Sequence, residues 1–167
     1  MKAVVVPYDP KWPALYEAAR LQLMSALGAN LEEIEHMGST AVPGLSSKPV
    51  IDIAVGVRDL DATVAVMTGI DYEYVPRFET AMPFRRLFVK YDSDVFRSGY
   101  HVHIVATGHP FMHADVAFRD HMRNDAEDLA QYEHLKLSLS GQLIDEYYQN
   151  KSDFVVGIKR KLGLPLF

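Results

Sequence analysis

The stretch His36-Met37-Gly38-Ser39-Thr40-Ala41-Val42-Pro43-Gly44-Leu45-Ser46-Ser47-Lys48-Pro49-Val50-Ile51-Asp52-Ile53 decides the fold, because it joins a small-residue turn to a buried strand that carries an acid. Apolar alternation through Ile34 and His36 predicts one strand that ends at Gly38-Ser39, and the apolar run from Val50 to Val57 predicts a second. A turn of small residues lets backbone N–H groups approach an anion, and a carboxylate one strand away can hold a divalent cation. The stretch therefore predicts a joint phosphate and metal site.

The order of these residues is similar to the signature of the nucleotidyltransferase superfamily. That signature has an apolar residue, Gly, then Gly or Ser, a spacer, and an Asp followed by an apolar residue and a second acid. Gly38-Ser39 and Asp52-Ile53 match it, whereas Ala54 stands where the second acid is expected. The resemblance implies a nucleotidyltransferase-like fold in which Gly38, Ser39 and Thr40 contact phosphate.

A longer resemblance is to the GrpB family. It rests on GSTAVPGLSSKPVID at 38–52, on FRDHMR at 118–123 and on Tyr132 with Leu135-Lys136, and it extends from the Trp12 region to Lys151 and Phe154. Members of that family are assigned by resemblance to the nucleotidyltransferase fold, and some are fused to dephospho-CoA kinase. The resemblance therefore implies a functional link to coenzyme A biosynthesis, while the reaction of the family is poorly defined.

Length and composition narrow the protein class. A chain of 167 residues that is 49% hydrophobic suits one domain over 1–167 with its own core. No cysteine occurs, so any metal must be held by Asp, Glu, His or water. The net charge of −5 gives no strong nucleic-acid signal. The apolar run before Pro7 is too short for a signal peptide or a membrane span, so we expect a cytoplasmic protein without a membrane partner.

Hydrophobic periodicity places strands first and helices later. Asp9 as N-cap and Pro10 as first helical residue predict a helix that lasts until Gly28. The pattern predicts strands at 31–37, 50–57, 71–75, 85–91 and 99–106, turns at 91–94 and 98–99, and helices at 59–69, 111–122, 125–148 and 152–162. This order predicts an α+β fold, a nucleotidyltransferase-like mixed sheet packed by helices with a helical C-terminal third.

Asp52 is the strongest candidate for a functional side chain. An aspartate between Ile51 and Ile53 in a buried strand costs free energy unless it is paired or ligates a cation. The alternative is a strand-end aspartate that accepts backbone hydrogen bonds. Ser39 is a candidate phosphate and catalytic contact, or else only a turn residue, and Lys48 is either a phosphate contact or a solvated loop lysine.

His101 and His103 lie two residues apart, so both point to one face of the predicted strand. Neutral imidazole suits Zn²⁺ and Mn²⁺ better than Mg²⁺, and this pair is either a set of metal ligands with Asp52 or surface decoration. The segment His101-Val102-His103-Ile104-Val105 is also similar to the motif of histidine-triad hydrolases, in which histidines alternate with apolar residues. In this chain Val105 stands at the position of the third histidine.

The remaining basic and imidazole groups are weaker candidates. Arg119, Lys136 and Lys151 match basic positions of the GrpB pattern. Without that resemblance each would be interpreted as a surface cation, and the resemblance makes Arg119 and Lys136 candidate phosphate contacts. His109 and His113 have helical ligand spacing, but Pro110 between them marks a helix start. His121 and His134 are expected at exposed helix positions.

These observations favour a metal-dependent, nucleotidyltransferase-like protein that binds a nucleoside triphosphate, with Mn²⁺, Mg²⁺ or Zn²⁺ as cofactor and an unidentified acceptor. One alternative is a nucleotide-binding or regulatory module without catalysis, which the missing acid at Ala54 supports. A weaker alternative is a nucleotide hydrolase that uses His101 and His103.

Overall fold

The structure, a computed structural model, describes residues 2–92 and 99–167. Its centre is a five-stranded sheet with the order β1-β2-β5-β4-β3, in which β2 and β5 are parallel and the other neighbours antiparallel. The strands are β1 (Leu31–Met37), β2 (Val50–Val57), β3 (Glu73–Tyr74), β4 (Arg85–Tyr91) and β5 (Gly99–Ala106). The predicted mixed sheet is confirmed.

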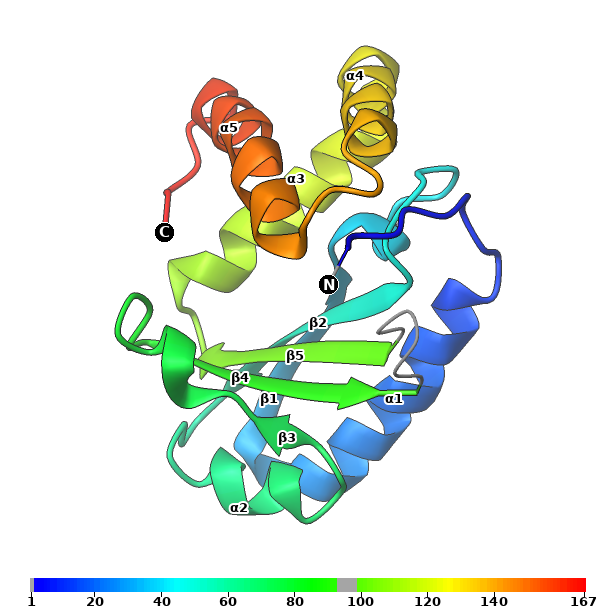
Figure 1. Cartoon of the computed structure of the whole chain (residues 1–167). Coiled ribbons are helices and arrows are strands. Elements are labelled where there is room, and N and C mark those ends of the chain that lie inside the picture. The colour runs from blue at the N-terminus through cyan, green and yellow to red at the C-terminus, as the bar shows by residue number, and fades with distance from the viewer. Residues whose placement is uncertain (1, 93–98) are drawn as a thin grey trace.

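Helices cover both faces of this sheet (Figure 1). The two that precede β3, α1 (Trp12–Leu27) and α2 (Thr63–Thr68), lie on one face. The other face is covered by the C-terminal helices α3 (Pro110–Asn124), α4 (Ala126–Ser138) and α5 (Ile144–Lys161). The α+β class and the helical C-terminal third are therefore confirmed. None of the helices within the described ranges is long and apolar enough to cross a membrane.

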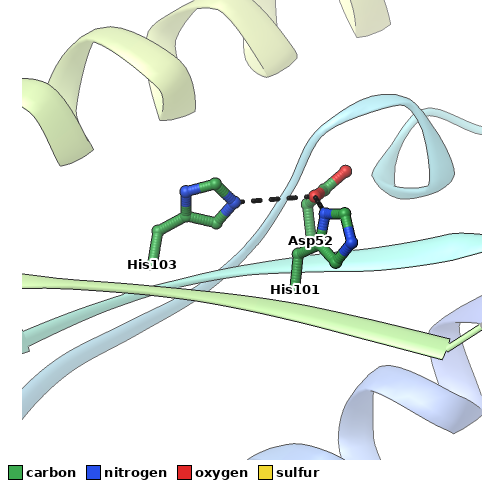
Figure 2. Close-up of side chains that lie close together, drawn as sticks. All are labelled: Asp52, His101 and His103. Atoms are coloured by element: carbon green, nitrogen blue, oxygen red, sulfur yellow. Dashed lines mark ion pairs between the residues drawn. The ribbon is translucent and has the colours of Figure 1, made fainter. Parts of the chain in front are cut away.

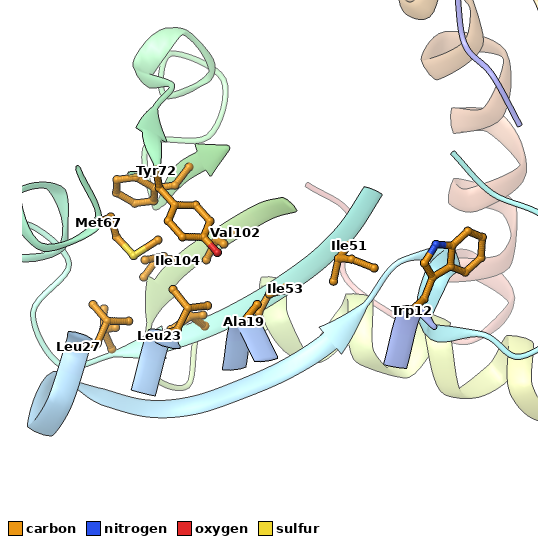
Figure 3. Close-up of a cluster of buried hydrophobic side chains, with 13 residues drawn as sticks. Trp12, Ala19, Leu23, Leu27, Ile51, Ile53, Met67, Tyr72, Val102 and Ile104 are labelled. Atoms are coloured by element: carbon orange, nitrogen blue, oxygen red, sulfur yellow. The ribbon is translucent and has the colours of Figure 1, made fainter. Parts of the chain in front are cut away.

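The main apolar core lies between the sheet and the α1/α2 layer (Figure 3). Because side chains alternate along a strand, every second residue of β2 and β5 enters this core. Ile53, Val102 and Ile104 are fully buried there and pack with Leu23 of α1 and Met67 of α2. The intervening residues of the same strands, among them Asp52, His101 and His103, therefore face the C-terminal helices.

The single helix predicted at 125–148 is wrong. The chain leaves the helix after Ser138 and starts α5 at Ile144, which then continues through the predicted break before residue 152 to Lys161. Gly141, with φ of +90°, makes the turn between them. Backbone hydrogen bonds join this turn to the N-terminal segment, from Gly141 N–H to the Ala3 carbonyl and from Ala3 N–H to Gln142. A contact distant in sequence thus sets the break.

Other boundaries need smaller corrections. The first helix begins at Trp12, because the Asp9 carboxylate and carbonyl accept the N–H groups of Lys11 and Trp12 in a preceding turn. The helix predicted at 59–69 is only Thr63–Thr68, and the strand predicted at 71–75 is only Glu73–Tyr74. The predicted turns at 91–94 and 98–99 fall largely outside the described residues.

Candidate functional site

Asp52 of β2 and the imidazoles of His101 and His103 of β5 meet on the sheet face below the C-terminal helices (Figure 2). The parallel register places Asp52 beside His101 and Ala54 beside His103. Asp52 Oδ1 lies 3.6 Å from His101 Nδ1 and 3.7 Å from His103 Nε2. One ligand atom from each residue lies within 4.8 Å of the others. One carboxylate oxygen and two imidazole nitrogens form a donor set that fits Mn²⁺ or Zn²⁺.

Gly38 holds the turn after β1 directly against the Asp52 carboxylate. Its φ is +71°, and a Cβ built on it would lie 2.5 Å from Asp52 Oδ2. Glycine is required here for both reasons, conformation and close approach. Ser39 follows as the first residue of a short 3-10 turn that ends at Ala41, so the Gly38-Ser39 turn adjoins the acid.

The electrostatics around Asp52 favour its ionised form. Burial alone would raise the pKa of Asp52, but the nearby His103 and His101 rings and the Lys48 ammonium outweigh burial and lower that pKa to about 2. The side chain keeps 30% of its surface exposed, so the carboxylate is open in part to a ligand. Asp52 is therefore an ionised acceptor at neutral pH.

Lysine and tyrosine side chains form the opposite wall, which we call the lysine wall. It comprises Lys48 of the signature loop, Lys136 and Tyr132 of α4, and Lys151, Tyr147 and Tyr148 of α5. Lys48 donates to the Tyr148 hydroxyl, and its Nζ lies 4.0 Å from the centre of that ring. All three lysines interact electrostatically with Asp52, so the wall and the acid belong to one site.

Lys136 is the most unusual residue of the lysine wall. Its side chain is 1% exposed, and within the described part of the chain its Nζ has no hydrogen-bond partner. Burial lowers the pKa of Lys136 well below its usual value, and the ammonium of Lys151 lowers it further. A buried amine without a partner costs free energy, because it loses water and gains no hydrogen bond. An anionic ligand would remove this cost.

Two residues that the sequence did not single out contact the imidazoles. Arg85 of β4, which is 9% exposed, donates from its NH1 group to His103 Nδ1 at 3.0 Å. The Tyr91 hydroxyl of the same strand lies 3.3 Å from His101 Nε2. An arginine in a strand that pairs with the histidine strand was the available signal for Arg85, but it required knowledge of the β4–β5 pairing.

The structure does not bring every predicted residue to this site. The Thr40 hydroxyl is fully buried and donates to the Val50 carbonyl at 3.2 Å, so the geometry gives the predicted phosphate contact of this side chain no support. The Arg119 guanidinium is occupied by Glu35 and the His36 carbonyl, both at 2.7 Å, and by Asp120 at 2.8 Å. Arg119 therefore fastens α3 to β1, and the geometry gives its predicted phosphate role no support.

The other histidines have structural surroundings. His109 caps α3 by accepting the Phe111 N–H at 3.2 Å, and its ring stacks on Phe84. His121 is not exposed as predicted, because it contacts Asp128 at 2.6 Å and only 15% of its side chain is exposed. Lys161 also contacts Asp128, at 2.7 Å, and supplies the cation of that cluster. His134 is exposed, as predicted.

Comparison of structures shows that the fold is similar to that of Cid1. Cid1 in complex with its short product ApU superposes with a TM-score of 0.53 at 15% sequence identity, over 79% of this chain and 42% of Cid1. At that identity the likeness concerns the fold alone. The predicted resemblance to the nucleotidyltransferase fold is confirmed at this level.

The chain belongs to the GrpB family, whose sequence model, described as GrpB protein, matches residues 2–161. A UPF0157 protein of Streptomyces coelicolor is 36% identical over 162 residues, which covers 93% of this chain and 82% of the relative. The crystal structure of the conserved protein GrpB from Enterococcus faecalis has a TM-score of 0.83 at 29% identity and covers 95% of this chain and 96% of its own. The predicted family is therefore confirmed.

Proposed function

We propose that this protein binds a nucleoside triphosphate together with a divalent metal ion, and that it transfers a nucleotidyl or phosphoryl group to an acceptor. The observation that carries the proposal is the buried amine of Lys136, which has no hydrogen-bond partner among the described residues and belongs to the same site as the Asp52 carboxylate. The site combines the cations of the lysine wall with the anionic carboxylate of Asp52. These charges complement a ligand that consists of an anion and a bound cation. A metal-bound polyphosphate is such a ligand.

Each part of the site has a separate task in this proposal. The ammonium groups of Lys48, Lys136 and Lys151 neutralise the phosphates, and the Gly38-Ser39 turn lets the ligand approach Asp52. Asp52 and an imidazole hold the divalent ion, which would polarise the phosphoryl oxygens. Group transfer of this kind depends mainly on in-line positioning and charge neutralisation, so a site without a nucleophilic side chain suffices.

The charges imply that the metal arrives with the nucleotide. In the ligand-free site one ionised carboxylate interacts with the ammonium groups of Lys48 and Lys151, and the guanidinium of Arg85 adds a further cation next to His103. Such a site repels a free divalent cation, whereas a triphosphate brings the anionic ligands that the cation needs. We therefore expect tight metal binding only when a polyphosphate is present.

Calorimetric titration tests the proposal. The probes are ATP, UTP and inorganic triphosphate, each with Mn²⁺, with Mg²⁺ and with no metal. Asp52→Asn should remove the metal-dependent part of the affinity, and Lys136→Met should weaken all three anions. Lys161→Met is the matched control, because Lys161 lies on α5 and pairs with Asp128 away from the site. Equal anion affinity of the parent, Lys136→Met and Lys161→Met proteins would refute the proposed site.

A second function, nucleotide binding without catalysis, is supported by Ala54. This residue occupies the position of the second acid on the site face and is 1% exposed among the apolar residues Met37 and Phe111. Two adjacent divalent ions need several anionic ligands, so this substitution leaves room for one metal. Measuring binding and pyrophosphate or phosphate release on the same samples separates the two functions. Saturable binding without any turnover would favour the second.

A further inference from the structure

Arg85 places a second buried cation on the face of the sheet that carries Asp52, at the end away from the signature loop. Arg85 pairs with Val105 of β5, and Val105 pairs with Gly56 of β2. Gly56 follows Asp52 by four residues, which is about 13 Å along the strand. Lys48 of the lysine wall instead precedes β2. Arg85 and Lys48 therefore lie on opposite sides of Asp52 along the strands.

The guanidinium of Arg85 has no carboxylate in hydrogen-bond contact among the residues that the structure describes. Its NH1 group contacts His103 Nδ1 at 3.0 Å, and its Cζ lies 5.7 Å from the centre of the Phe111 ring. Asp115 attracts it electrostatically, but the Asp115 carboxylate is paired with Lys159 at 2.5 Å. Arg85 is only 9% exposed, and a buried charge without an ionic partner costs free energy. An anionic ligand would remove this cost.

One edge of the guanidinium remains for such a ligand. NH1 is used by His103, whereas Nε and NH2 have no acceptor within residues 2–92 and 99–167. Neither nitrogen belongs to the buried polar atoms that lack a partner, so both reach solvent. The Nε and NH2 groups of an arginine present two parallel N–H bonds, which is the geometry that binds a carboxylate or a phosphate with two hydrogen bonds.

An aromatic cluster adjoins this guanidinium. It consists of Phe84, Phe111 and Phe167, whose ring centres lie 5.3, 5.7 and 5.8 Å apart. Phe111 is the ring next to Arg85, and Phe167 keeps 46% of its surface exposed. Apolar rings beside a few charged donors are typical of sites that bind small organic molecules. The surroundings of Arg85 therefore suit an anion with an apolar body.

We infer that Arg85 anchors a second anion subsite, which receives the acceptor through a carboxylate or phosphate group while the aromatic cluster contacts the apolar part of the same molecule. The inference rests on the proposed function and deepens it, because it names the chemical class of the acceptor. His103 links this subsite to the metal site. Its Nδ1 contacts Arg85, and its Nε2 lies 3.7 Å from Asp52 Oδ1 (Figure 2). One imidazole ring therefore separates the acceptor's anionic group from the proposed metal ligand Asp52.

Titrations followed by ¹H–¹⁵N spectra of metal-free protein test the subsite. The probes are phenyl phosphate and benzoate, with inorganic phosphate and acetate as their counterparts without the ring. Arg85→Met should weaken both ring-bearing anions about tenfold, the effect expected for a lost charged hydrogen bond. Arg86→Met is the matched control, because Arg86 points to the other face of β4 and pairs with Asp61 at 3.0 Å. It should change these affinities by less than about twofold.

A crossed comparison separates this subsite from the lysine wall. Arg85→Met should change the affinity for inorganic triphosphate by less than about twofold, whereas Lys136→Met should weaken triphosphate and leave benzoate unchanged. Arg85→Lys keeps the charge and loses the two-pronged donor, so its benzoate affinity should lie between those of the parent and Arg85→Met. The head group that binds more tightly, carboxylate or phosphate, identifies the chemistry of the acceptor.

The parent protein supplies a readout that depends on no variant, the side-chain Nε–H signal of Arg85. A signal that does not move with either ring-bearing anion would overturn the subsite, and so would equal affinities of the parent and Arg85→Met. Equal weakening of triphosphate and benzoate by both Arg85→Met and Lys136→Met would show one anion site instead of two. If the parent binds benzoate through Arg85 but no triphosphate, the proposed function and the acceptor role fail, and the anion subsite stands.

Discussion

The two faces of the same two strands differ completely in chemistry. Toward α1 and α2, β2 and β5 present fully buried aliphatic residues such as Ile53 and Ile104. Toward the C-terminal helices, the neighbouring positions carry Asp52, His101 and His103. One face therefore stabilises the fold by burying apolar surface, while the other carries polar groups that, in our proposal, reduce stability and bind a ligand. We expect substitutions on the two faces to change stability in opposite directions.

The largest effect should come from the aliphatic face. Ile53→Ala removes side-chain atoms from a position with no exposed surface, and it should destabilise the protein by about 3 kcal/mol. Ile53→Val is the matched control and should cost about 1 kcal/mol. Urea denaturation followed by circular dichroism measures both. Polyphosphate affinity should be unchanged while the variants are folded, and a parallel loss of affinity would show that the faces are coupled.

Acid should affect the aliphatic face through His36. This ring stacks on Tyr16 of α1, and burial, as the main cause, lowers its pKa from 6.5 to about 4. A depressed histidine pKa means that the folded state prefers the neutral ring. Stability is therefore fully present above pH 6.5 and falls as the pH drops toward 4, by on the order of 3 kcal/mol.

Urea denaturation at a series of pH values tests this expectation. His36→Gln keeps a hydrogen-bonding side chain near Thr40 and removes the titration, so its stability should change less over the same range. If both proteins lose stability equally between pH 6.5 and 4, groups other than His36 are responsible.

Gly38 lies where the polar face begins, and its substitution should have an intermediate effect. Gly38→Ala places a Cβ at positive φ and against Asp52 Oδ2, which should cost about 2 kcal/mol and weaken metal-dependent binding. Gly44→Ala is the matched control, because Gly44 has φ of +83° but no atom within 4 Å of the added Cβ. It should lose less stability and retain binding. Equal losses would mean that the contact with Asp52 is unimportant.

The smallest change in stability should come from Lys136, and it should be a gain rather than a loss. Lys136→Met replaces a buried amine, which forms no hydrogen bond within the part of the chain that the structure describes, with an apolar chain of similar length. The ligand-free protein should therefore become more stable by about 1 kcal/mol. The pKa of Lys136 lies below its ordinary value of 10.5. The free-energy cost of burying this amine in the parent therefore falls as the pH rises toward 10.5, because the unfolded chain also loses the proton there.

Thermal melting of ligand-free protein at neutral pH and near pH 10 measures this gain and its decrease. A melting temperature below that of the parent at neutral pH would show that Lys136 stabilises the fold through contacts of its own.

The sequence predicted the features that follow from the order of neighbouring residues, namely the positions of the strands and the face on which each side chain lies. Alternation in the 101–103 segment predicted that both imidazoles share a face, and apolar runs predicted β1, β2, β4 and β5 closely. The break between α4 and α5 was missed, because the N-terminal segment imposes it through Ala3 and Gly141. Arg85 and Tyr91 were missed for the same reason, because their partners come from strand pairing.

The parallel pairing of β2 with β5 also governs when the site can form. Antiparallel neighbours close through short connections, but β2 and β5 are joined only after α2, β3 and β4 have been synthesised. Contacts between distant segments form slowly, since the entropy of closing the loop opposes them. Asp52 meets its imidazoles only in this step, and the lysines of α4 and α5 come still later in the chain. Ligand binding should therefore appear with the final folding phase, which makes it a direct reporter of completed folding.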